Sequence, residues 1–274
     1  MARETNSSSL GDGDANKKDG IQSVSRALSI LELFNERRPT LSTSDIAGLT
    51  GLNRATAYRF CQTLLKLGYL EETYSRTFRP GIKAISLARA ALSSRDLPDM
   101  ALPYLQRLRE NTGETVNMAF LDGADVVYVS RLLNDDLLAL RLFVGSRLPA
   151  HATSLGRAIL AYLPQEEVET VLGDRELEAI TQYTIIDRAK LMKELDRIRT
   201  RGYALNDEEV VLGIRGVAAP VFNAVSRPIA AVNVSIARPI EGEELREVLA
   251  PQVVETARAV TALVTELAID SGRH

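Results

Sequence analysis

The segment between residues 42 and 80 constrains the fold most, because it joins two short helix patterns through a glycine. Ser42 is a good N-cap for the first pattern, and Gly51 interrupts the chain directly after it. Asn53 is a good N-cap for the second pattern. Apolar residues then recur at helical spacing: Ala57, Phe60, Cys61 and Leu64.

A third helix and a hairpin flank this pair. Residues 24–34 place apolar side chains at i, i+3, i+4 and i+7 spacing, which is typical of an amphipathic helix. Beyond Gly68, residues 69–70 and 77–78 lie on either side of a polar turn, as hairpin strands do. Three short helices, a tight turn and a hairpin predict a winged helix-turn-helix domain over residues 21–81.

The polar face of the second helix of the pair predicts base reading. It carries no carboxylate, which phosphates would repel, and its Arg and Gln side chains can read guanine and adenine. Wing arginines can neutralise phosphates or enter the minor groove. The alternative is a solvated helix face, but the order of helices, turn and wing favours DNA. The candidate DNA-binding residues are Asn53, Arg54, Thr56, Tyr58, Arg59, Gln62, Arg76 and Arg79.

Charge and composition narrow the function classes. Residues 16–81 hold ten Lys and Arg against six Asp and Glu, whereas the remainder is acidic, so only the first block suits a polyanion. One cysteine and two histidines provide no disulfide, no thiolate zinc cluster and no HExxH motif, and no GxSxG elbow is present. We therefore expect that the protein is not an enzyme and binds no metal and no cofactor. Cys61 lies on the apolar stripe of its helix, and we interpret it as a core residue.

The ends of the chain carry no targeting or membrane signal. Residues 1–20 are low in apolar content and are predicted to be a disordered tail. They lack the apolar core of a signal peptide, and no apolar stretch approaches the ~20 residues of a membrane span. We expect a cytoplasmic protein with no membrane partner.

The remaining sequence predicts a second, α+β domain. Residues 82–98 are expected to form a linker helix and junction, and residues 99–270 an effector-binding and oligomerisation domain. Strands are predicted at residues 115–121 and 126–130 around an Asp-Gly turn, at 138–142, at 216–222 and at 229–236. Helices are predicted at 99–111, 153–163 and 187–201, and a long final helix contains Pro251. The expected architecture is one antiparallel sheet with helices packed on it.

Two features of this domain suggest a ligand. Residues 152–156 would open a helix, whose free amides can bind a carboxylate. Asn233 and Ser235 are two apart on an apolar strand, so both point to one side, either toward a ligand or toward solvent. His151 is expected to be structural, with a ligand hydrogen bond as the alternative. Arg141 and Arg147 are either surface charges or partners of a second carboxylate.

Several long motifs resemble the IclR family of bacterial regulators. They are IQSVSRAL at residues 21–28, SDIA at 44–47, RATAYR at 54–59, LGYL at 67–70, LPAHATSLGRA at 148–158, RGYA at 201–204 and VAAPVFN at 217–223. Residues 54–59, the 92–98 junction, GSRLP at 145–149 and DEE at 207–209 look most like the β-ketoadipate-pathway regulators, which respond to protocatechuate, 4-hydroxybenzoate, β-ketoadipate or related acids.

The resemblance implies a GAF-like effector domain and a pocket for a small organic acid. It implies that the ligand-binding residues are Thr153, Ser154, Leu155, Asn206, Gly216, Asn233 and Ser235. Asn206 stands where the family usually has Asp or Ser, and Gly216 where it often has Cys, Ser or Ala. The family resemblance also suggests dimers that pair into tetramers.

These observations together predict a ligand-responsive regulator of a catabolic operon for aromatic acids. One short recognition helix contacts few bases, so we expect a homodimer or a dimer of dimers on an inverted-repeat operator in double-stranded DNA. The alternatives are an architectural DNA binder whose second domain only oligomerises, and an enzyme of GAF fold.

Overall fold

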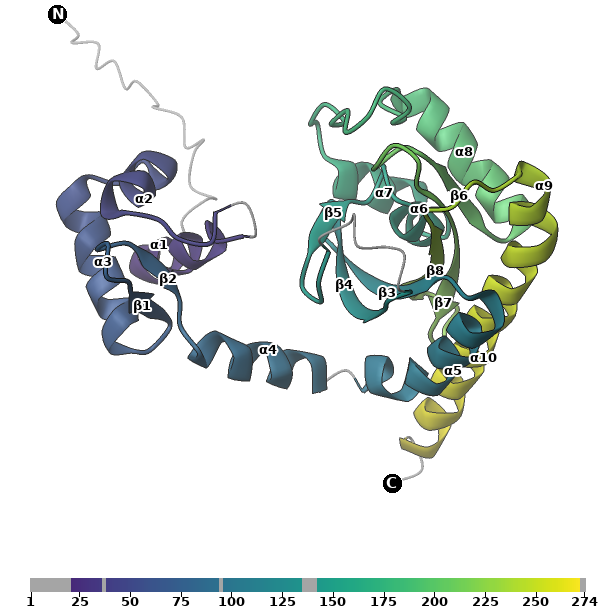
Figure 1. The fold of residues 1–274 in the computed structure, drawn as a ribbon, viewed down its shortest axis with the longest axis horizontal. Helices are drawn as coiled ribbons and strands as arrows, with labels where there is room; N and C mark the ends of the chain where they lie inside the picture. Colours follow the sequence, from purple (N-terminus) through teal and green to yellow (C-terminus); the bar gives the residue numbers. More distant parts are fainter. Residues whose placement is uncertain (1–20, 36–37, 94–95, 135–141, 272–274) are drawn as a thin grey trace, which may run out of the picture. The chain divides into compact units, whose positions relative to one another are not determined.

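The computed structural model describes residues 21–35, 38–93, 96–134 and 142–271. The chain divides into two compact units, one ending at Ala91 and the other beginning at Leu92 (Figure 1). The expected disordered tail at residues 1–20 lies outside the described residues, as do Arg141 and most of the strand expected at 138–142.

The first unit is the predicted winged helix-turn-helix. Its helices are α1 (Gln22–Glu32), α2 (Thr43–Thr50) and α3 (Arg54–Lys66), and its wing pairs β1 (Leu70–Glu72) with β2 (Phe78–Pro80) in antiparallel fashion. Ser42 and Asp45 form a capping box at the start of α2, and Gly51 adopts a left-handed φ of 69° at its end. Leu41 bridges to Phe78, so the segment before α2 is tied to the wing.

A small apolar core holds this unit together. Its buried residues come from all three helices and the wing: Ile30, Leu41, Ile46, Ala57, Cys61, Leu64, Leu70 and Phe78. Burial raises the pKa of the Cys61 thiol to about 11, so it stays protonated near neutral pH and packs as a small apolar side chain.

Helix α4 (Lys83–Ser93) follows the wing and begins the segment expected to link the domains. Ile85 and Leu87 of this helix are 63% and 61% exposed, and Ile82 just before it is 73% exposed. The expected helix in this segment is therefore present, and several of its described apolar side chains are exposed.

The second unit is built on one six-stranded antiparallel sheet, with the strand order β5-β4-β3-β8-β7-β6. The strands are β3 (Thr115–Asp122), β4 (Asp125–Leu132), β5 (Arg147–Pro149), β6 (Ala204–Asp207), β7 (Arg215–Phe222) and β8 (Pro228–Ile236). The helices are α5 (Leu97–Thr112), α6 (Ser154–Leu160), α7 (Gln165–Leu172), α8 (Arg188–Arg201), α9 (Gly242–Glu244) and α10 (Ala250–Ser271). The predicted α+β fold with an antiparallel sheet is thus confirmed.

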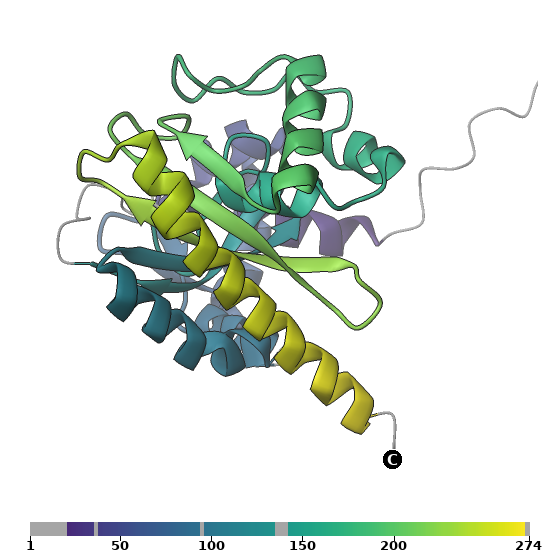
Figure 2. The same ribbon diagram turned by 90° about the vertical axis from the view of Figure 1, so that its right-hand side faces the viewer.

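The two faces of this sheet carry separate apolar cores, because strand side chains alternate between faces. One face, with Val116, Met118 and Val232, packs against α5 and α10, which cross it in Figure 2. The other face, with Ala119, Ala218 and Ala231, packs against α6. Beyond these alanines the second face becomes polar, and this change positions the ligand cavity described below.

Some elements escaped the sequence analysis. The strands β5 and β6 have three and four residues, too few for a clear alternation, and α7 has only eight. Pro251 lies at the start of α10, directly after a π-helical turn at Leu245–Leu249. That position suits a residue without an N–H donor.

Within the described residues, no helix is both long enough and apolar enough to cross a membrane. In the same part of the chain, no group of three or more His, Cys, Asp or Glu side chains could hold a metal ion.

Gly156 allows α6 to approach the preceding turn. A Cβ atom there would lie 2.2 Å from the Ala150 carbonyl oxygen, which belongs to the backbone and cannot swing away. We expect Gly156→Ala to lower the free energy of unfolding by about 1–3 kcal/mol, as overpacking does. Gly48→Ala is the matched control, because nothing lies within 4 Å and α2 would gain helix propensity. Thermal unfolding of both variants checks this; equal stability would contradict it.

Candidate DNA interface and ligand cavity

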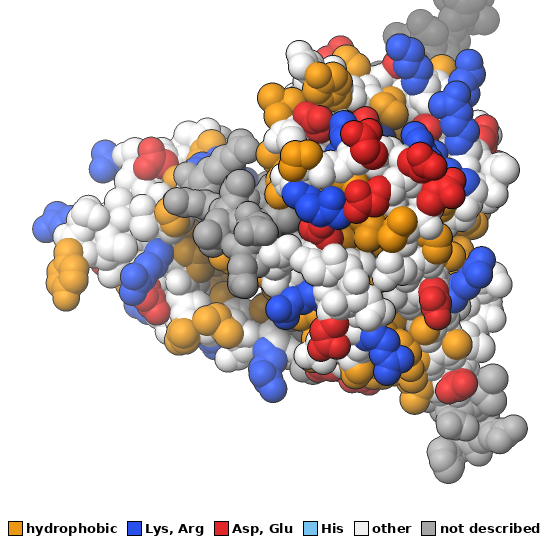
Figure 3. All heavy atoms as spheres, turned by 45° about the vertical axis from the view of Figure 1, so that its right-hand side comes forward, with side chains coloured by type: hydrophobic (Ala, Val, Ile, Leu, Met, Phe, Trp, Pro, Cys, Tyr) orange, Lys and Arg blue, Asp and Glu red, His pale blue; other side chains and the backbone are white. Residues whose placement is uncertain are grey.

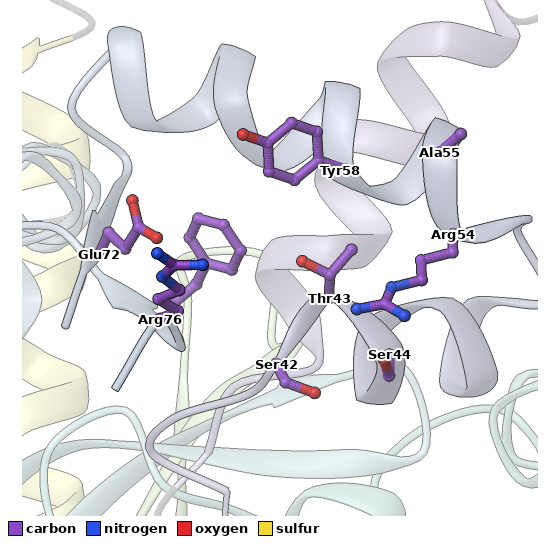
Figure 4. Close-up of a pocket in the computed structure, with 9 residues that line it drawn as sticks. Ser42, Thr43, Ser44, Arg54, Ala55, Tyr58, Glu72 and Arg76 are labelled. Carbon is purple, nitrogen blue, oxygen red and sulfur yellow. The ribbon is translucent and has the colours of Figure 1, made fainter. Parts of the chain in front are cut away.

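An open hollow of about 670 Å³ lies between the start of α2, the start of α3 and the wing (Figure 4). Three predicted DNA-binding residues line it: Arg54 and Tyr58 from α3, and Arg76 from the wing. All three side chains are exposed. Tyr58 and Arg76 extend into the hollow from opposite sides in Figure 4, which makes it a concave surface with cationic and aromatic groups.

The other predicted residues of α3 lie outside that hollow. Asn53 caps the helix, since its Oδ1 accepts a 2.8 Å hydrogen bond from the Thr56 N–H. Its amide oxygen is therefore occupied in positioning α3. Thr56 and Gln62 are half-buried, whereas Arg59 is exposed one helical turn beyond Ala55. Arg59 stays the strongest candidate for a base contact outside the hollow.

Arg79 is held by its neighbour in the wing. Its Nε and Nη2 donate to Glu71 Oε2 at 3.0 and 2.8 Å, and the two residues face each other across β1 and β2. Arg79, with the Ile82 N–H, holds the pKa of Glu71 below its usual value. A phosphate contact by Arg79, as expected from the sequence, has to compete with this ion pair.

The hollow also contains groups that the sequence analysis missed. Ser42, Thr43 and Ser44 line it from the start of α2, and Glu72 lines it from the wing. Arg76 adopts a left-handed φ of 55°, which turns the wing chain. On the molecular face shown in Figure 3, Lys and Arg side chains are mixed with Asp and Glu side chains.

The second unit contains a small cavity at the polar end of the sheet face that α6 covers. Its volume is about 40 Å³. Six of the seven predicted ligand-binding residues line it: Thr153, Ser154, Asn206, Gly216, Asn233 and Ser235. The seventh, Leu155, does not line it, and its side chain is fully buried in the apolar cluster under α6.

Polar side chains form a continuous row across three neighbouring strands. Arg131 pairs in register with Asn117, and Asn117 with Asn233. Arg131 Nη1 donates to Asn117 Oδ1 at 3.3 Å, and Asn117 Nδ2 donates to Asn233 Oδ1 at 2.8 Å. Asn233 Nδ2 then donates to the Ser154 and Ser235 hydroxyl oxygens at 3.4 and 3.2 Å. The row links β4, β3 and β8 to α6.

Local contacts fix the start of α6 beside this row. Thr153 Oγ1 caps the helix by accepting from the Gly156 N–H at 2.9 Å, and Asn206 Nδ2 donates to the Ala152 carbonyl at 2.7 Å. At Gly216, an added Cβ would lie 3.0 Å from the Val234 carbonyl oxygen and 3.6 Å from the Ser154 hydroxyl. Glycine therefore leaves room between β7 and α6 that any larger residue would fill.

A buried ion pair anchors the other side of α6. Arg157 is 1% exposed and makes two hydrogen bonds to the carboxylate of Glu209, at 2.6 and 2.7 Å. Its Nη2 also donates to the Leu205 carbonyl at 2.6 Å. Such a pair is strong only when both partners remain, since a lone buried charge is costly. It holds the helix against the segment that leaves β6.

Models of known protein families match both the first and the second unit of the chain. The family model described as "Bacterial transcriptional regulator IclR C-terminal" matches residues 89–262, and the one described as "IclR helix-turn-helix domain" matches residues 23–73. The protein belongs to the IclR family.

Relatives of this IclR-family chain include two curated regulators. The HTH-type transcriptional regulator XynR of Escherichia coli is 36% identical over 78% of this chain and 86% of its own. The Pca regulon regulatory protein of Pseudomonas putida is 36% identical over 79% of this chain and 75% of its own. The latter agrees with the expected likeness to β-ketoadipate-pathway regulators. As predicted, the IclR-family protein is a transcriptional regulator and not an enzyme.

Solved structures agree with the fold. An IclR homologue from Microbacterium hydrocarbonoxydans, complexed with 4-hydroxybenzoate, aligns with a TM-score of 0.75. The two chains are 25% identical, and the alignment covers 88% of this chain and 98% of that one.

Two charged residues of the IclR-family protein take the structural roles expected for them. The exposed Arg147 pairs with Asp122 and Asp125 at the surface. His151 is buried, and its Nε2 lies 3.1 Å from the Glu178 carbonyl. Burial lowers the pKa of His151, so the ring is neutral near pH 7.

The residues at or beside the cavity of this IclR-family protein that escaped the sequence analysis include Asn117, Tyr128 and Arg131. A signal for Asn117 existed, because it is a polar residue inside an apolar strand, like Asn233. No comparable signal existed for the other two, since their place depends on strand register and on a bulge between β3 and β4. Burial raises the pKa of Tyr128 to about 12, so its hydroxyl stays protonated.

We expect Arg59→Ala to weaken specific DNA binding by about 1–3 kcal/mol, because a bidentate base contact is lost. Arg79→Ala should weaken specific and non-specific binding alike, because it removes a phosphate contact. Gel-shift titrations with operator and unrelated DNA at one salt concentration check both. Arg197→Ala, on the exposed side of α8, is the matched control. If Arg59→Ala keeps both affinity and base preference, Arg59 does not read a base.

Proposed function

We propose that this regulator binds a small organic acid in the cavity of its second unit and changes its operator binding in response. The acid is aromatic or dicarboxylic, and the target is a catabolic operon of the aromatic-acid or β-ketoadipate type. The row of buried amides and hydroxyls carries this proposal. Asn117 and Asn233 are 1% and 4% exposed and hydrogen-bond to each other, and this row supplies polar groups beside a cavity whose other walls include apolar side chains, as a ligand site does.

The relatives support the acid class. One structural neighbour was solved with 4-hydroxybenzoate, and one relative is named for a Pca regulon. The polar groups of the cavity, Ser154, Asn233 and Ser235, suit the oxygen atoms of such an acid.

The size of the cavity supports a ligand-driven change of shape. Its volume of about 40 Å³ is well below the roughly 150 Å³ of a cavity that accepts benzene. An aromatic acid therefore binds only a state in which the lining residues have moved apart. A ligand that binds one state better than another shifts the population toward it, which is the requirement for an effector.

We expect Ser235→Leu to abolish the ligand response, because a bulky apolar side chain fills the cavity. The wild type and the variant are compared by thermal shift with 4-hydroxybenzoate, protocatechuate and β-ketoadipate, and by operator gel shift on the same preparation. An unchanged response in the variant would contradict the location of the ligand. If no acid stabilises the wild-type protein, the effector class is wrong and an architectural role becomes the better account.

We also propose that the active species is a homodimer or a dimer of dimers on an inverted repeat. The short α3 offers few base-reading residues, and two-fold symmetry doubles the reading surface. Light scattering at micromolar concentration should give at least twice the chain mass. A monomeric mass would overturn the proposal.

A further inference from the structure

A carboxylate lies in the hollow of the DNA-binding unit, where phosphates would repel it. Glu72 is exposed at the end of β1 and lines the hollow together with Arg54 and Arg76. In Figure 4 the side chains of Glu72 and Arg76 lie on the wing side of this space, across from Arg54. None of the other described residues that line the hollow carries a carboxylate. The function of this interface therefore has to account for Glu72.

Strand pairing directs Glu72 into the hollow. Leu70 and Phe78 are buried in the core of this unit. Glu72 lies on the same side of the wing as both of them, because it is two residues after Leu70 and opposite Phe78 in register. Phe78 also lines the hollow, so the core ends where the hollow begins. The pairing that buries the two apolar side chains thus fixes the direction of the Glu72 carboxylate.

The neighbouring carboxylate has a partner, whereas Glu72 has none among the described residues. Glu71 points to the opposite side of the wing, where Arg79 pairs with it at 2.8 Å. In the described part of the chain, the carboxylate of Glu72 forms no ion pair and no hydrogen bond, and the guanidinium groups of Arg54 and Arg76 form none either. The oxygen atoms of Glu72 are therefore available to a group that enters the hollow.

An ionised carboxylate can only accept hydrogen bonds, and duplex DNA offers few donors. The oxygen atoms of phosphate and deoxyribose are acceptors. The base edges add further acceptors and one kind of donor, the exocyclic amino group: cytosine N4 and adenine N6 in the major groove, and guanine N2 in the minor groove. A carboxylate at a DNA interface therefore finds a favourable partner only at such an amino group.

We propose that Glu72 reads the amino group of one base and disfavours every placement of the protein in which a phosphate enters the hollow. Glu72 is then a specificity-determining residue, because it stabilises the complex with the correct site and destabilises the others. Repulsion of this kind raises the ratio of specific to non-specific affinity without requiring a large gain of affinity for the site itself. The inference concerns the first unit alone and is independent of the proposed effector.

The first test compares the affinities for two DNA probes by gel-shift titration. One probe is the duplex that the wild-type protein enriches from a random library, and the other is an unselected duplex of the same length. Glu72→Gln keeps the size of the side chain but removes its charge and adds a donor for phosphate, so it should bind the unselected duplex more tightly. The ratio of the two affinities should fall about fivefold to a hundredfold, the range for one base contact. An unchanged ratio, or a library from which the wild type enriches no sequence, would overturn the assignment.

The second test removes the amino group from the DNA. In the enriched duplex, each adenine, guanine or cytosine is replaced in turn by purine, hypoxanthine or 2-pyrimidinone, which lack the exocyclic amino group. At the base that Glu72 reads, the replacement should weaken binding of the wild type and leave binding of Glu72→Ala unchanged, because alanine offers no acceptor. A purely structural role of Glu72 would not couple to a single base. The assignment is refuted if every replacement affects the two proteins equally.

Two variants are the matched controls. Glu71→Gln removes the same charge from the opposite side of the wing, so its response to each base replacement should equal that of the wild type. Glu255→Gln removes an exposed carboxylate of the second unit and should leave the affinities for both duplexes unchanged. If Glu71→Gln loses the same base dependence as Glu72→Ala, the charge of the wing as a whole sets the preference and the role given to Glu72 is wrong.

Discussion

The buried ion pair between Arg157 and Glu209 is the interaction on which the effector unit depends most. It fixes α6 to the segment after β6, and Thr184 Oγ1 adds a hydrogen bond to the Glu209 carbonyl at 2.6 Å. The first turn of α6 supplies Ser154 to the cavity, so the geometry of the proposed ligand site depends on this pair. Removing one partner would strand a charge inside the protein, a loss of about 3–5 kcal/mol.

The sheet face next to this ion pair contributes both to the apolar core and to the cavity. Small side chains at Ala119, Ala218 and Ala231 let α6 pack closely, which builds the core. A few residues further along the same strands, Asn117 and Asn233 replace the apolar side chains and open the cavity. The proposed ligand site and the core therefore share strands but not positions, and a ligand that widened the cavity would work against the packing beside it.

The sequence predicted features that are decided by nearby residues, and it missed features that depend on how the strands pair. Ser42 and Asn53 were identified as caps because capping is decided within three or four residues. Asn233 and Ser235 were identified because strand alternation is also local. The burial of the Leu155 side chain depends on how α6 packs on the sheet, and the ion pair of Arg79 with Glu71 depends on pairing across the wing. Arg131 reaches the cavity only through the pairing of β3 with β4.

The ion pair between Glu71 and Arg79 also affects the salt dependence expected when the wing binds DNA. A free arginine that neutralises a phosphate displaces a condensed cation from the DNA, and each such event steepens the salt dependence of binding by about 0.9 in a double-logarithmic plot. Here the arginine already has an internal counter-charge, and the pair as a whole is neutral. A phosphate contact by Arg79 that leaves this pair intact would release fewer counterions than a free arginine does, so the number of basic residues overstates the salt dependence expected for DNA binding.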